Sequence, residues 1–322
     1  MKKRQECVDV GSEYCPCYLA ETNNCITCSQ LQGKEFCDCN WRGVCVYQEF
    51  VMNRNKIKQQ RDYYNSSVED IKQIGMDSYL IKLKVTKTLA RQLNEPGSYV
   101  FLRDKKLPQY FDVPMSIMQS DTSNGVITIA YKAIGAKSKS LNNCKDSILI
   151  KGPYWNGAYG LGNLKKVKNQ NCLVIARGIS QAPSLLVIEK LIKNGNKISL
   201  VLDKGSVGEI FIHDLIKNTN IYTYEEDVMS EKGKSLITHI LHNKNISLIY
   251  SAGSDLLHMN IIKIIDELGM DPYLVVTNNN ELCCGEGICG GCTTRLKDGT
   301  RVKPCKTQID SRQIIERRVL LD

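Results

Sequence analysis

The cysteines near the C-terminus constrain this chain more than any other feature. Cys284, Cys289, Cys292 and Cys305 follow the spacing C-x4-C-x2-C-x12-C. Four thiolates on one short Gly-rich loop suit an iron–sulfur cluster, and plant-type [2Fe–2S] proteins use C-x4-C-x2-C with a more distant fourth cysteine. Zinc and free thiols are the alternatives, but zinc usually takes two separated C-x2-4-C pairs and only one occurs here. The spacing therefore predicts a [2Fe–2S] site.

The residues around these cysteines support a compact loop. Glycine at positions 285, 287, 290 and 291 leaves room for a cluster and permits positive φ. Lys297-Asp298-Gly299 has the composition of a hairpin turn between the third and fourth ligands. Cys283 is expected to be a spare thiol, although a slip of the loop by one residue would let it replace Cys284.

A second group of cysteines lies in the N-terminal segment, residues 1–60. This segment is short and poor in large aliphatic residues, so it can bury little core by itself, and thiolate–metal bonds can supply the missing folding free energy. Proximity suggests two ligand sets. The first is Cys25, Cys28, Cys37 and Cys39, and the second is Cys7, Cys15, Cys17 and Cys45. Structural zinc, a second iron–sulfur cluster, and free or disulfide-bonded thiols all remain open.

Length and charge exclude several classes of protein. The 322 residues allow two domains plus smaller modules. The net charge of +9 is spread along the chain without a basic stripe and interleaved aromatics, which argues against nucleic-acid binding. The sequence has no secretory signal and no apolar run of membrane-spanning length. The chain has fifteen cysteines, and we therefore expect a cytoplasmic protein whose clustered cysteines bind metal rather than form disulfides.

The middle of the chain shows the alternation of an antiparallel barrel. Short apolar–polar runs at 79–85, 98–102, 125–131 and 147–150 are separated by turn residues. The polar stretch 53–67 before them reads as a short helix or a linker, and we take it as a domain boundary. The expected barrel covers residues 75–165.

Residues 170–276 alternate strand and helix instead. Buried-strand runs are expected at 172–176, 197–202, 247–250 and 272–276. Helices are expected at 182–194, 211–217, 235–242 and 257–268. This order predicts a doubly wound parallel sheet. The histidines of this domain are expected to be surface or packing residues rather than metal ligands; they are His213, His239, His242 and His258.

The cysteine loop at 284–305 also resembles that of a known family, the electron-transfer subunit of dihydroorotate dehydrogenase B. It is similar to the small flavin subunit of NADH-dependent ferredoxin:NADP oxidoreductases and to the related sulfide dehydrogenase subunit. The resemblance covers about residues 75–322. It implies a flavin-binding barrel at 75–165, a nicotinamide-binding α/β domain at 170–276 and a [2Fe–2S] module at 277–322.

Three stretches stand where this family binds FAD. Residues 113–116 match Arg-Pro-x-Ser, residues 131–141 match Tyr-x-x-x-Gly-x-Gly-Thr-x-x-Leu, and residues 152–157 match a Gly-Pro turn. The resemblance implies that the first holds the isoalloxazine edge and a phosphate, and the second the pyrophosphate. The implied FAD residues are Pro114, Met115, Ser116, Tyr131, Lys132, Gly135, Lys137, Ser138 and Gly152.

The FAD pattern departs from the family at two positions. Val113 replaces an arginine and so removes a bidentate phosphate partner, while Lys137 replaces a glycine. We hypothesise that Lys137 or Lys132 supplies the lost positive charge. The alternative is a barrel that no longer binds flavin.

The nucleotide loop of the α/β domain departs further. Residues 176–183 read Ala-Arg-Gly-Ile-Ser-Gln-Ala-Pro where the family has Gly-Gly-Gly-x-Gly-x-Ala-Pro, and residues 251–254 replace Cys-Gly-Pro. Gly178 is the candidate that remains for NAD(P)H, because bulk at Arg177 and Gln181 stands where pyrophosphate should approach. Arg177 could instead bind a phosphate or a carboxylate of a partner. NAD(P)H binding is therefore left open.

Together these features predict an oxidoreductase that relays electrons. Electrons from NAD(P)H or another donor would pass through FAD and the [2Fe–2S] cluster to a catalytic partner subunit in a hetero-oligomer. A ferredoxin with an acidic face is compatible with the positive net charge. Two alternatives remain: a non-catalytic iron–sulfur and zinc scaffold that has lost FAD and NAD, and a single-chain NAD(P)H-dependent reductase.

Overall fold

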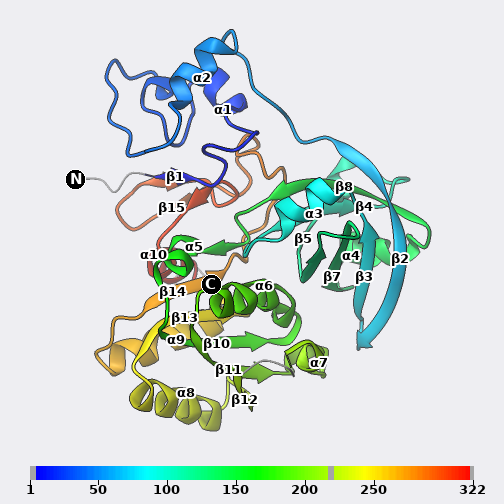
Figure 1. Cartoon of the computed structure of the whole chain (residues 1–322), viewed down its shortest axis with the longest axis vertical. Helices are drawn as coiled ribbons and strands as arrows, with labels where there is room; N and C mark the ends of the chain where they lie inside the picture. The colour runs from blue at the N-terminus through cyan, green and yellow to red at the C-terminus, as the bar shows by residue number, and fades with distance from the viewer. Residues whose placement is uncertain (1–4, 217–220, 320–322) are drawn as a thin grey trace. The chain divides into compact units, whose positions relative to one another are not determined.

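A computed structural model describes residues 5–216 and 221–319, which form two compact units (Figure 1). Unit 1 consists of residues 1–63 and 280–309, and unit 2 of residues 64–279 and 310–322. The two cysteine-rich segments were expected as separate modules at the two ends of the chain. The structure instead places them in the same unit.

Unit 1 has little regular structure. Its helices are α1 (Tyr18–Glu21) and α2 (Val46–Met52), and its strands are β1 (Glu6–Cys7), β15 (Thr294–Arg295), β16 (Arg301–Val302) and β17 (Thr307–Gln308). β1 pairs antiparallel with β17, which sets Cys7 opposite Thr307 and joins the two cysteine-rich segments. β15 and β16 form the predicted hairpin, and Gly299 in its turn has φ of +81°.

The first sheet of unit 2 is the expected antiparallel one. Its order is β5-β4-β8-β2-β3-β7-β6. The strands are β2 (Tyr63–Gly75), β3 (Ser78–Lys84), β4 (Tyr99–Arg103), β5 (Val113–Ser116), β6 (Gln119–Asp121), β7 (Val126–Lys132) and β8 (Ser147–Tyr154), with helices α3 (Lys87–Leu93) and α4 (Ala136–Ser140). β5 and β6 stand at the two ends of the hydrogen-bonded order, although only residues 117 and 118 separate them along the chain, so the closed barrel stays a prediction. β2 starts at Tyr63, so the polar stretch 53–67 is not a linker along its whole length.

The second sheet of unit 2 is the expected α/β layer. Its order is β12-β11-β10-β13-β14-β9, parallel except for the edge strand β9. The strands are β9 (Ala158–Tyr159), β10 (Asn171–Arg177), β11 (Lys197–Asp203), β12 (Ile221–Glu225), β13 (Ile246–Ala252) and β14 (Tyr273–Thr277). The helices are α5 (Leu161–Lys166), α6 (Gln181–Lys193), α7 (His213–Ile216), α8 (Glu231–Asn243), α9 (Asp255–Glu267) and α10 (Ser311–Val319).

Continuous apolar runs explain this second sheet. In β10, Cys172 and Val174 belong to the core that also contains α6, while the alternate residues Leu173 and Ile175 are equally buried. A strand that is buried on both faces is expected where helices cover both sides of a parallel sheet. The carboxyl ends of the parallel strands then meet at one edge of the sheet, where ligands bind in sheets of this kind. Within the described ranges, no helix is both long enough and apolar enough to span a membrane.

Candidate functional site

The four predicted cluster ligands converge in unit 1. Hydrogen bonds join the Cys305 thiol to those of Cys284 and Cys292, and the Cys284 thiol to that of Cys289. Cys305 and Cys292 are buried, whereas Cys283 is exposed and takes part in none of these contacts. The geometry therefore favours Cys284 over Cys283 as the first ligand.

Backbone N–H groups point at the sulfurs of this loop. The N–H of Glu286 donates to Cys284 Sγ at 3.3 Å, and the N–H of Cys289 donates to the same sulfur. The loop can turn these groups inward because its glycines at 285, 287 and 290 adopt φ between +71° and +76°; Gly291 does not need this conformation. Donors directed at a sulfur stabilise its thiolate form, the form that binds metal.

The contacts among the thiols also shift their pKa values in different directions. The hydrogen bond from Cys305, opposed by burial, lowers the pKa of Cys284 to about 4, with further help from backbone N–H groups. The same neighbour lowers the pKa of Cys292 to about 7. Conversely, contact with Cys284 and Cys292 raises the pKa of Cys305. The contacts within the loop therefore lower the pKa of Cys284 and Cys292 and raise that of Cys305.

The donor set fits a [2Fe–2S] group in kind and number. Four thiols on one loop with inward N–H groups are what such a cluster requires. Over residues 5–216 and 221–319, no three His, Cys, Asp or Glu side chains stand in the geometry of a finished metal centre. The thiols form hydrogen bonds with one another instead. Binding of the cluster by these sulfurs therefore requires rotation about their χ1 angles.

Three buried charges and one partly exposed carboxylate, Glu286, brace the cluster loop within unit 1. Arg61 forms a bidentate pair with Asp9, at 3.0 and 3.1 Å, and its NH1 lies 3.2 Å from Glu286 Oε2. Lys306 Nζ contacts Asp9 and lies 3.1 Å from the same Glu286 oxygen. Burial alone would raise the pKa of Asp9, but Lys306 and Arg61 hold it below its usual value. Glu286 and Lys306 flank the candidate ligands in sequence, so this neutral cluster fixes the loop.

The cysteines of the N-terminal segment separate differently from the expected sets. Cys7, Cys15, Cys17 and Cys25 line one small cavity, so Cys25 takes the place expected for Cys45. Burial raises the pKa of Cys28, and charge on Cys39 and Cys45 raises it further. The three cysteines therefore lie near one another. Cys37 is exposed. The cavity therefore groups Cys25 rather than Cys45 with the other three cysteines, while the ligand sets themselves stay a prediction.

The predicted FAD residues lie on β5, β7 and α4. Pro114, Met115 and Ser116 belong to the edge strand β5, and Met115 is buried. Tyr131 is buried in β7, and its hydroxyl donates to Asn142 at 2.7 Å. The Ser138 hydroxyl accepts the N–H of Gly135 within its own turn. The other glycine, Gly152, is buried in β8.

The two lysines proposed to replace the missing arginine have different surroundings. Lys137 Nζ donates to the carbonyl of Asp112 at 3.2 Å, directly before Val113. Lys132 Nζ donates to the carbonyl of Ser206, in the α/β layer, at 3.0 Å. Only Lys137 therefore lies beside the position where the arginine is lost.

The candidate nucleotide site is a cleft of about 530 Å³ at the carboxyl ends of β10 and β13. Its lining includes Arg177, Gly178 and Gly253. Gly178 has φ of +58°, as a tight turn requires, but a Cβ on Gly205 would lie only 3.0 Å from its backbone. The loop after β11 therefore covers the glycine where a pyrophosphate would approach.

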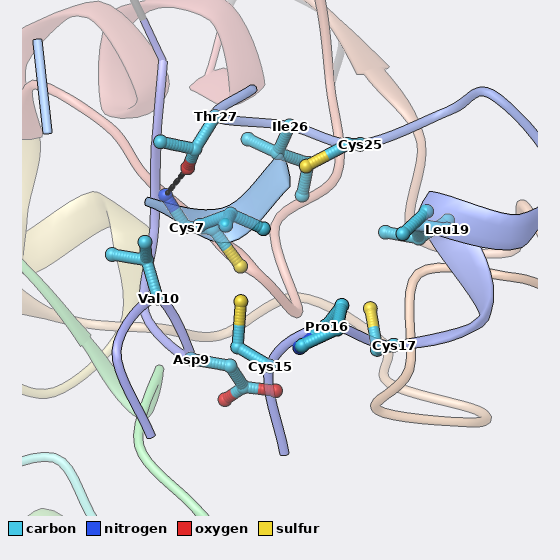
Figure 2. A pocket seen from close by; sticks show the side chains of 12 residues that line it. Cys7, Asp9, Val10, Cys15, Pro16, Cys17, Leu19, Cys25, Ile26 and Thr27 are labelled. Atoms are coloured by element: carbon cyan, nitrogen blue, oxygen red, sulfur yellow. Dashed lines mark hydrogen bonds between the residues drawn. The ribbon is translucent and has the colours of Figure 1, made fainter. Parts of the chain in front are cut away.

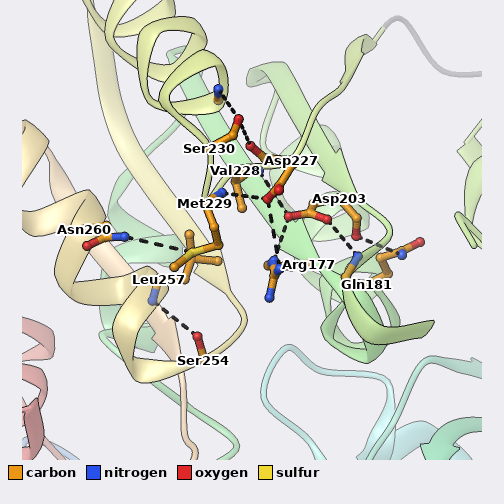
Figure 3. A network of polar contacts seen from close by, with 12 residues as sticks. Arg177, Gln181, Asp203, Asp227, Val228, Met229, Ser230, Ser254, Leu257 and Asn260 are labelled. Carbon is orange, nitrogen blue, oxygen red and sulfur yellow. Dashed lines mark hydrogen bonds and ion pairs between the residues drawn. The ribbon is translucent and has the colours of Figure 1, made fainter. Parts of the chain in front are cut away.

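Arg177 is engaged inside this cleft rather than free (Figure 3). Its Nε donates to Asp203 at 2.7 Å, and its NH2 lies 4.0 Å from Asp227. Asp203 ends β11, where dinucleotide-binding sheets place the acid that binds the ribose. Its carboxylate already accepts the N–H groups of Gly205 and Val228. The residues present therefore do not fit a nicotinamide dinucleotide in the usual manner.

His258 lies behind this cleft and is fully buried. Its Nδ1 is 2.8 Å from the hydroxyl of Ser251, and its Nε2 is 3.1 Å from that of Thr277. Ser251 lies in the segment that replaces the family's Cys-Gly-Pro. Its hydroxyl is thus hydrogen-bonded to the buried His258. Burial, and then the charge of Arg318, lower the pKa of His258 to about 3. As expected from the sequence, this histidine is a packing residue.

This burial predicts a pH-dependent stability. The pKa of His258 is lower in the folded than in the unfolded chain, so its contribution is complete above about pH 6.5 and falls as pH drops toward 3. We expect unit 2 to lose about 2 kcal/mol of unfolding free energy between pH 7 and pH 5 through this residue. Denaturant unfolding at both pH values measures it in wild type and in His258→Gln, which cannot titrate. Equal losses in the two proteins would refute the assignment.

Comparisons with known proteins agree with this fold. No known family model matches the chain. The dihydroorotate dehydrogenase B (NAD(+)) electron transfer subunit of Fusobacterium nucleatum is 27% identical over 250 residues, covering 73% of this chain and 92% of the relative. The subunit of the same name from Clostridium acetobutylicum is 24% identical over 217 residues, covering 66% and 81%.

Solved structures give the same fold. The NADH-dependent reduced ferredoxin-NADP oxidoreductase, studied for flavin-based electron bifurcation, superposes with a TM-score of 0.63 at 17% identity over 79% of this chain and 93% of that one. The ferredoxin reductase of carbazole 1,9a-dioxygenase gives 0.53 at 13% identity over 68% and 70%. The predicted resemblance is therefore confirmed, as is the expected oxidoreductase class.

Several residues that shape these sites could not be predicted from the sequence. Glu286 and Lys306 carry a weak signal, because charged residues next to cluster ligands stand out in a Gly-rich loop. Arg61, in contrast, lies in a polar stretch that gives no sign of burial. Asp203, which accepts a hydrogen bond from Arg177, also stands out in the sequence, because it ends a buried strand.

Proposed function

We propose that this chain is an electron-transfer flavoprotein subunit, which moves electrons between a reduced donor, FAD and a [2Fe–2S] cluster and delivers them to a partner oxidoreductase subunit. The observation that carries the proposal is the convergence of Cys284, Cys289, Cys292 and Cys305, with backbone N–H groups directed at their sulfurs. When bound, FAD accepts two electrons and releases them singly, and the cluster carries one electron at a time.

The residues of the chain would hold these groups and tune them. N–H donors from Glu286 and Cys289 would lower the cluster's net charge density and so raise its potential. Burial of Cys292 and Cys305 would exclude water from one side. On β5, Pro114 and Ser116 would face the flavin, as in the family that the chain resembles.

The partner is inferred from the relatives. They are named as electron transfer subunits, which implies a second subunit that carries the substrate chemistry. We extend this arrangement to the present chain and propose a hetero-oligomer. A ferredoxin partner remains a prediction from charge alone, and the substrate does not follow from the sites described.

The described residues support NAD(P)H as the electron donor less than they support the cluster. The Arg177–Asp203 pair and the loop at 205 occupy the positions that NAD(P)H would need. This observation favours one second candidate, a scaffold that binds metal but neither FAD nor NAD. Flavin content separates the two, because the scaffold would purify without it.

Lys137→Ala should release flavin if the relay proposal holds. Lys137 is the exposed ammonium group beside Val113, and removing it deletes the proposed replacement that lies next to the lost arginine. A charged hydrogen bond of this kind contributes about 1.5–3 kcal/mol, so FAD should bind about 10- to 100-fold more weakly. Flavin fluorescence during dilution or dialysis measures this affinity.

Lys132→Ala is the matched control. It removes an ammonium group from the same expected FAD motif, residues 131–141, but this group contacts Ser206 in the α/β layer. FAD affinity should stay within about threefold of wild type. If Lys132→Ala lost flavin and Lys137→Ala retained it, the assignment of the phosphate partner would be reversed.

A further inference from the structure

We propose that Cys7, Cys15, Cys17 and Cys25 form a tetrathiolate metal centre in unit 1, separate from the C-terminal cysteine loop. The electron-transfer function proposed above does not require this centre. It also differs from the ligand sets that spacing along the chain suggests, because it includes Cys25 and excludes Cys45.

The first argument is a cavity that these four residues share (Figure 2). It has a volume of about 20 Å³ and is closed by apolar side chains, among them Val10, Leu19 and Val46. The picture shows the four sulfurs around one open space, on turns from three parts of the segment. A space of this size holds about one water-sized particle, so it suits a single metal ion better than a cluster of several atoms.

The second argument is that backbone N–H groups already point at these sulfurs. Cys25 Sγ accepts the N–H of Cys28 at 3.3 Å and also that of Thr27. Cys15 accepts the N–H of Gly11, and Cys7 that of Asp9. A neutral thiol gains little from such donors, whereas a metal-bound thiolate is stabilised by them.

Asp9 borders the cavity but is not available as a ligand. Its carboxylate oxygens are taken by the bidentate pair with Arg61 and by Lys306. Besides the Thr27 hydroxyl, which accepts the N–H of Cys7, the other possible ligands that line the cavity among the described residues are thiols. A set of four thiolates selects soft or borderline metals, with zinc as the usual tetrahedral ion and iron–sulfur chemistry as the other occupant.

The third argument is stability. The small core of this segment consists of Cys15, Ala20, Cys28, Leu31, Val46 and Phe50. Every cysteine is free, so no disulfide holds the segment together. Binding a metal ion would release the thiol protons and add folding free energy where apolar burial is small.

The test compares metal content in full-length variants purified without oxygen. Zinc, iron and acid-labile sulfide are measured in wild type, Cys7→Ser, Cys25→Ser, Cys45→Ser and the double variant Cys7→Ser/Cys25→Ser. We expect Cys7→Ser and Cys25→Ser to lose the same metal, and the double variant to lose no more than either. Cys144→Ser is the control, since Cys144 is buried and lies in unit 2.

The outcome identifies both the ligands and the metal. Loss of zinc supports a single ion, and loss of iron together with sulfide supports the same four ligands around a cluster. If Cys45→Ser lost the metal that Cys7 holds while Cys25→Ser kept it, the proposal would be overturned.

A second measurement covers the case in which the serine variants do not fold. Wild-type protein is treated with iodoacetamide before and after a metal chelator, and alkylated cysteines are identified by mass spectrometry. The proposal predicts that Cys7, Cys15, Cys17 and Cys25 become reactive together as metal is released. Reactivity of all four before chelation would overturn it.

Discussion

Cys305→Ser should abolish the [2Fe–2S] absorbance and remove about two irons per chain. The Cys305 thiol contacts both Cys284 and Cys292, and it is only 2% exposed, so no water or neighbouring thiol can easily take its place. A serine hydroxyl is a poor ligand for iron in comparison with a thiolate. Visible spectra with iron and acid-labile sulfide analysis, on samples purified without oxygen, measure the loss.

Cys283→Ser provides the matched control for this variant. It removes a cysteine from the same loop, next to a candidate ligand, but its thiol is exposed and outside the thiol contacts. Iron and sulfide should remain at the wild-type level. Loss of the cluster in Cys283→Ser, with retention in Cys284→Ser, would show that the loop is shifted by one residue.

Arg61→Met should destabilise unit 1 by about 3–5 kcal/mol. The Arg61 side chain is 1% exposed and pairs with Asp9 and Glu286. Its guanidinium also lies 3.9 Å from the centre of the Tyr14 ring. The substitution leaves two carboxylates to share Lys306, and a buried charge without a partner costs more than the pair contributes. Trp41 fluorescence during denaturant unfolding, in a Trp155→Phe background, reports on unit 1 alone.

Lys58→Met is the control for this effect. It removes an ion pair of similar length in the same unit, since Lys58 Nζ lies 3.1 Å from Glu49. This pair is exposed to solvent and should contribute less than about 1 kcal/mol. Equal unfolding free energies in the two variants would contradict the stabilising role of the buried charges.

The elements of unit 2 were predictable because their signals are local. Apolar runs located β10, β11, β13 and β14, and alternation located β3, β4 and β7. The hairpin before Cys305 followed from its Asp-Gly turn. These patterns depend on neighbours in sequence, which is why their ends agree with the structure to within a few residues. α7 begins at His213, two residues after the start of the expected helix 211–217, whose last residue lies outside the described residues.

The arrangement of unit 1 could not be predicted, because it depends on contacts across the whole chain. Pairing of β1 with β17 joins residues about 300 positions apart. The buried partners of Arg61 lie at positions 9 and 286. The same limit applies to the N-terminal cysteines, since spacing within 40 residues does not determine which of them line one cavity.

The central claim is that the chain carries both flavin and a [2Fe–2S] cluster. One sample, purified anaerobically and analysed for its visible spectrum, flavin, iron and acid-labile sulfide, tests it most directly. We predict bound FAD, with two irons and two sulfides assigned to the C-terminal loop because Cys305→Ser removes them. Iron without flavin would contradict the relay and favour the scaffold, and a sample without iron or sulfide would contradict the account of the cysteine loop.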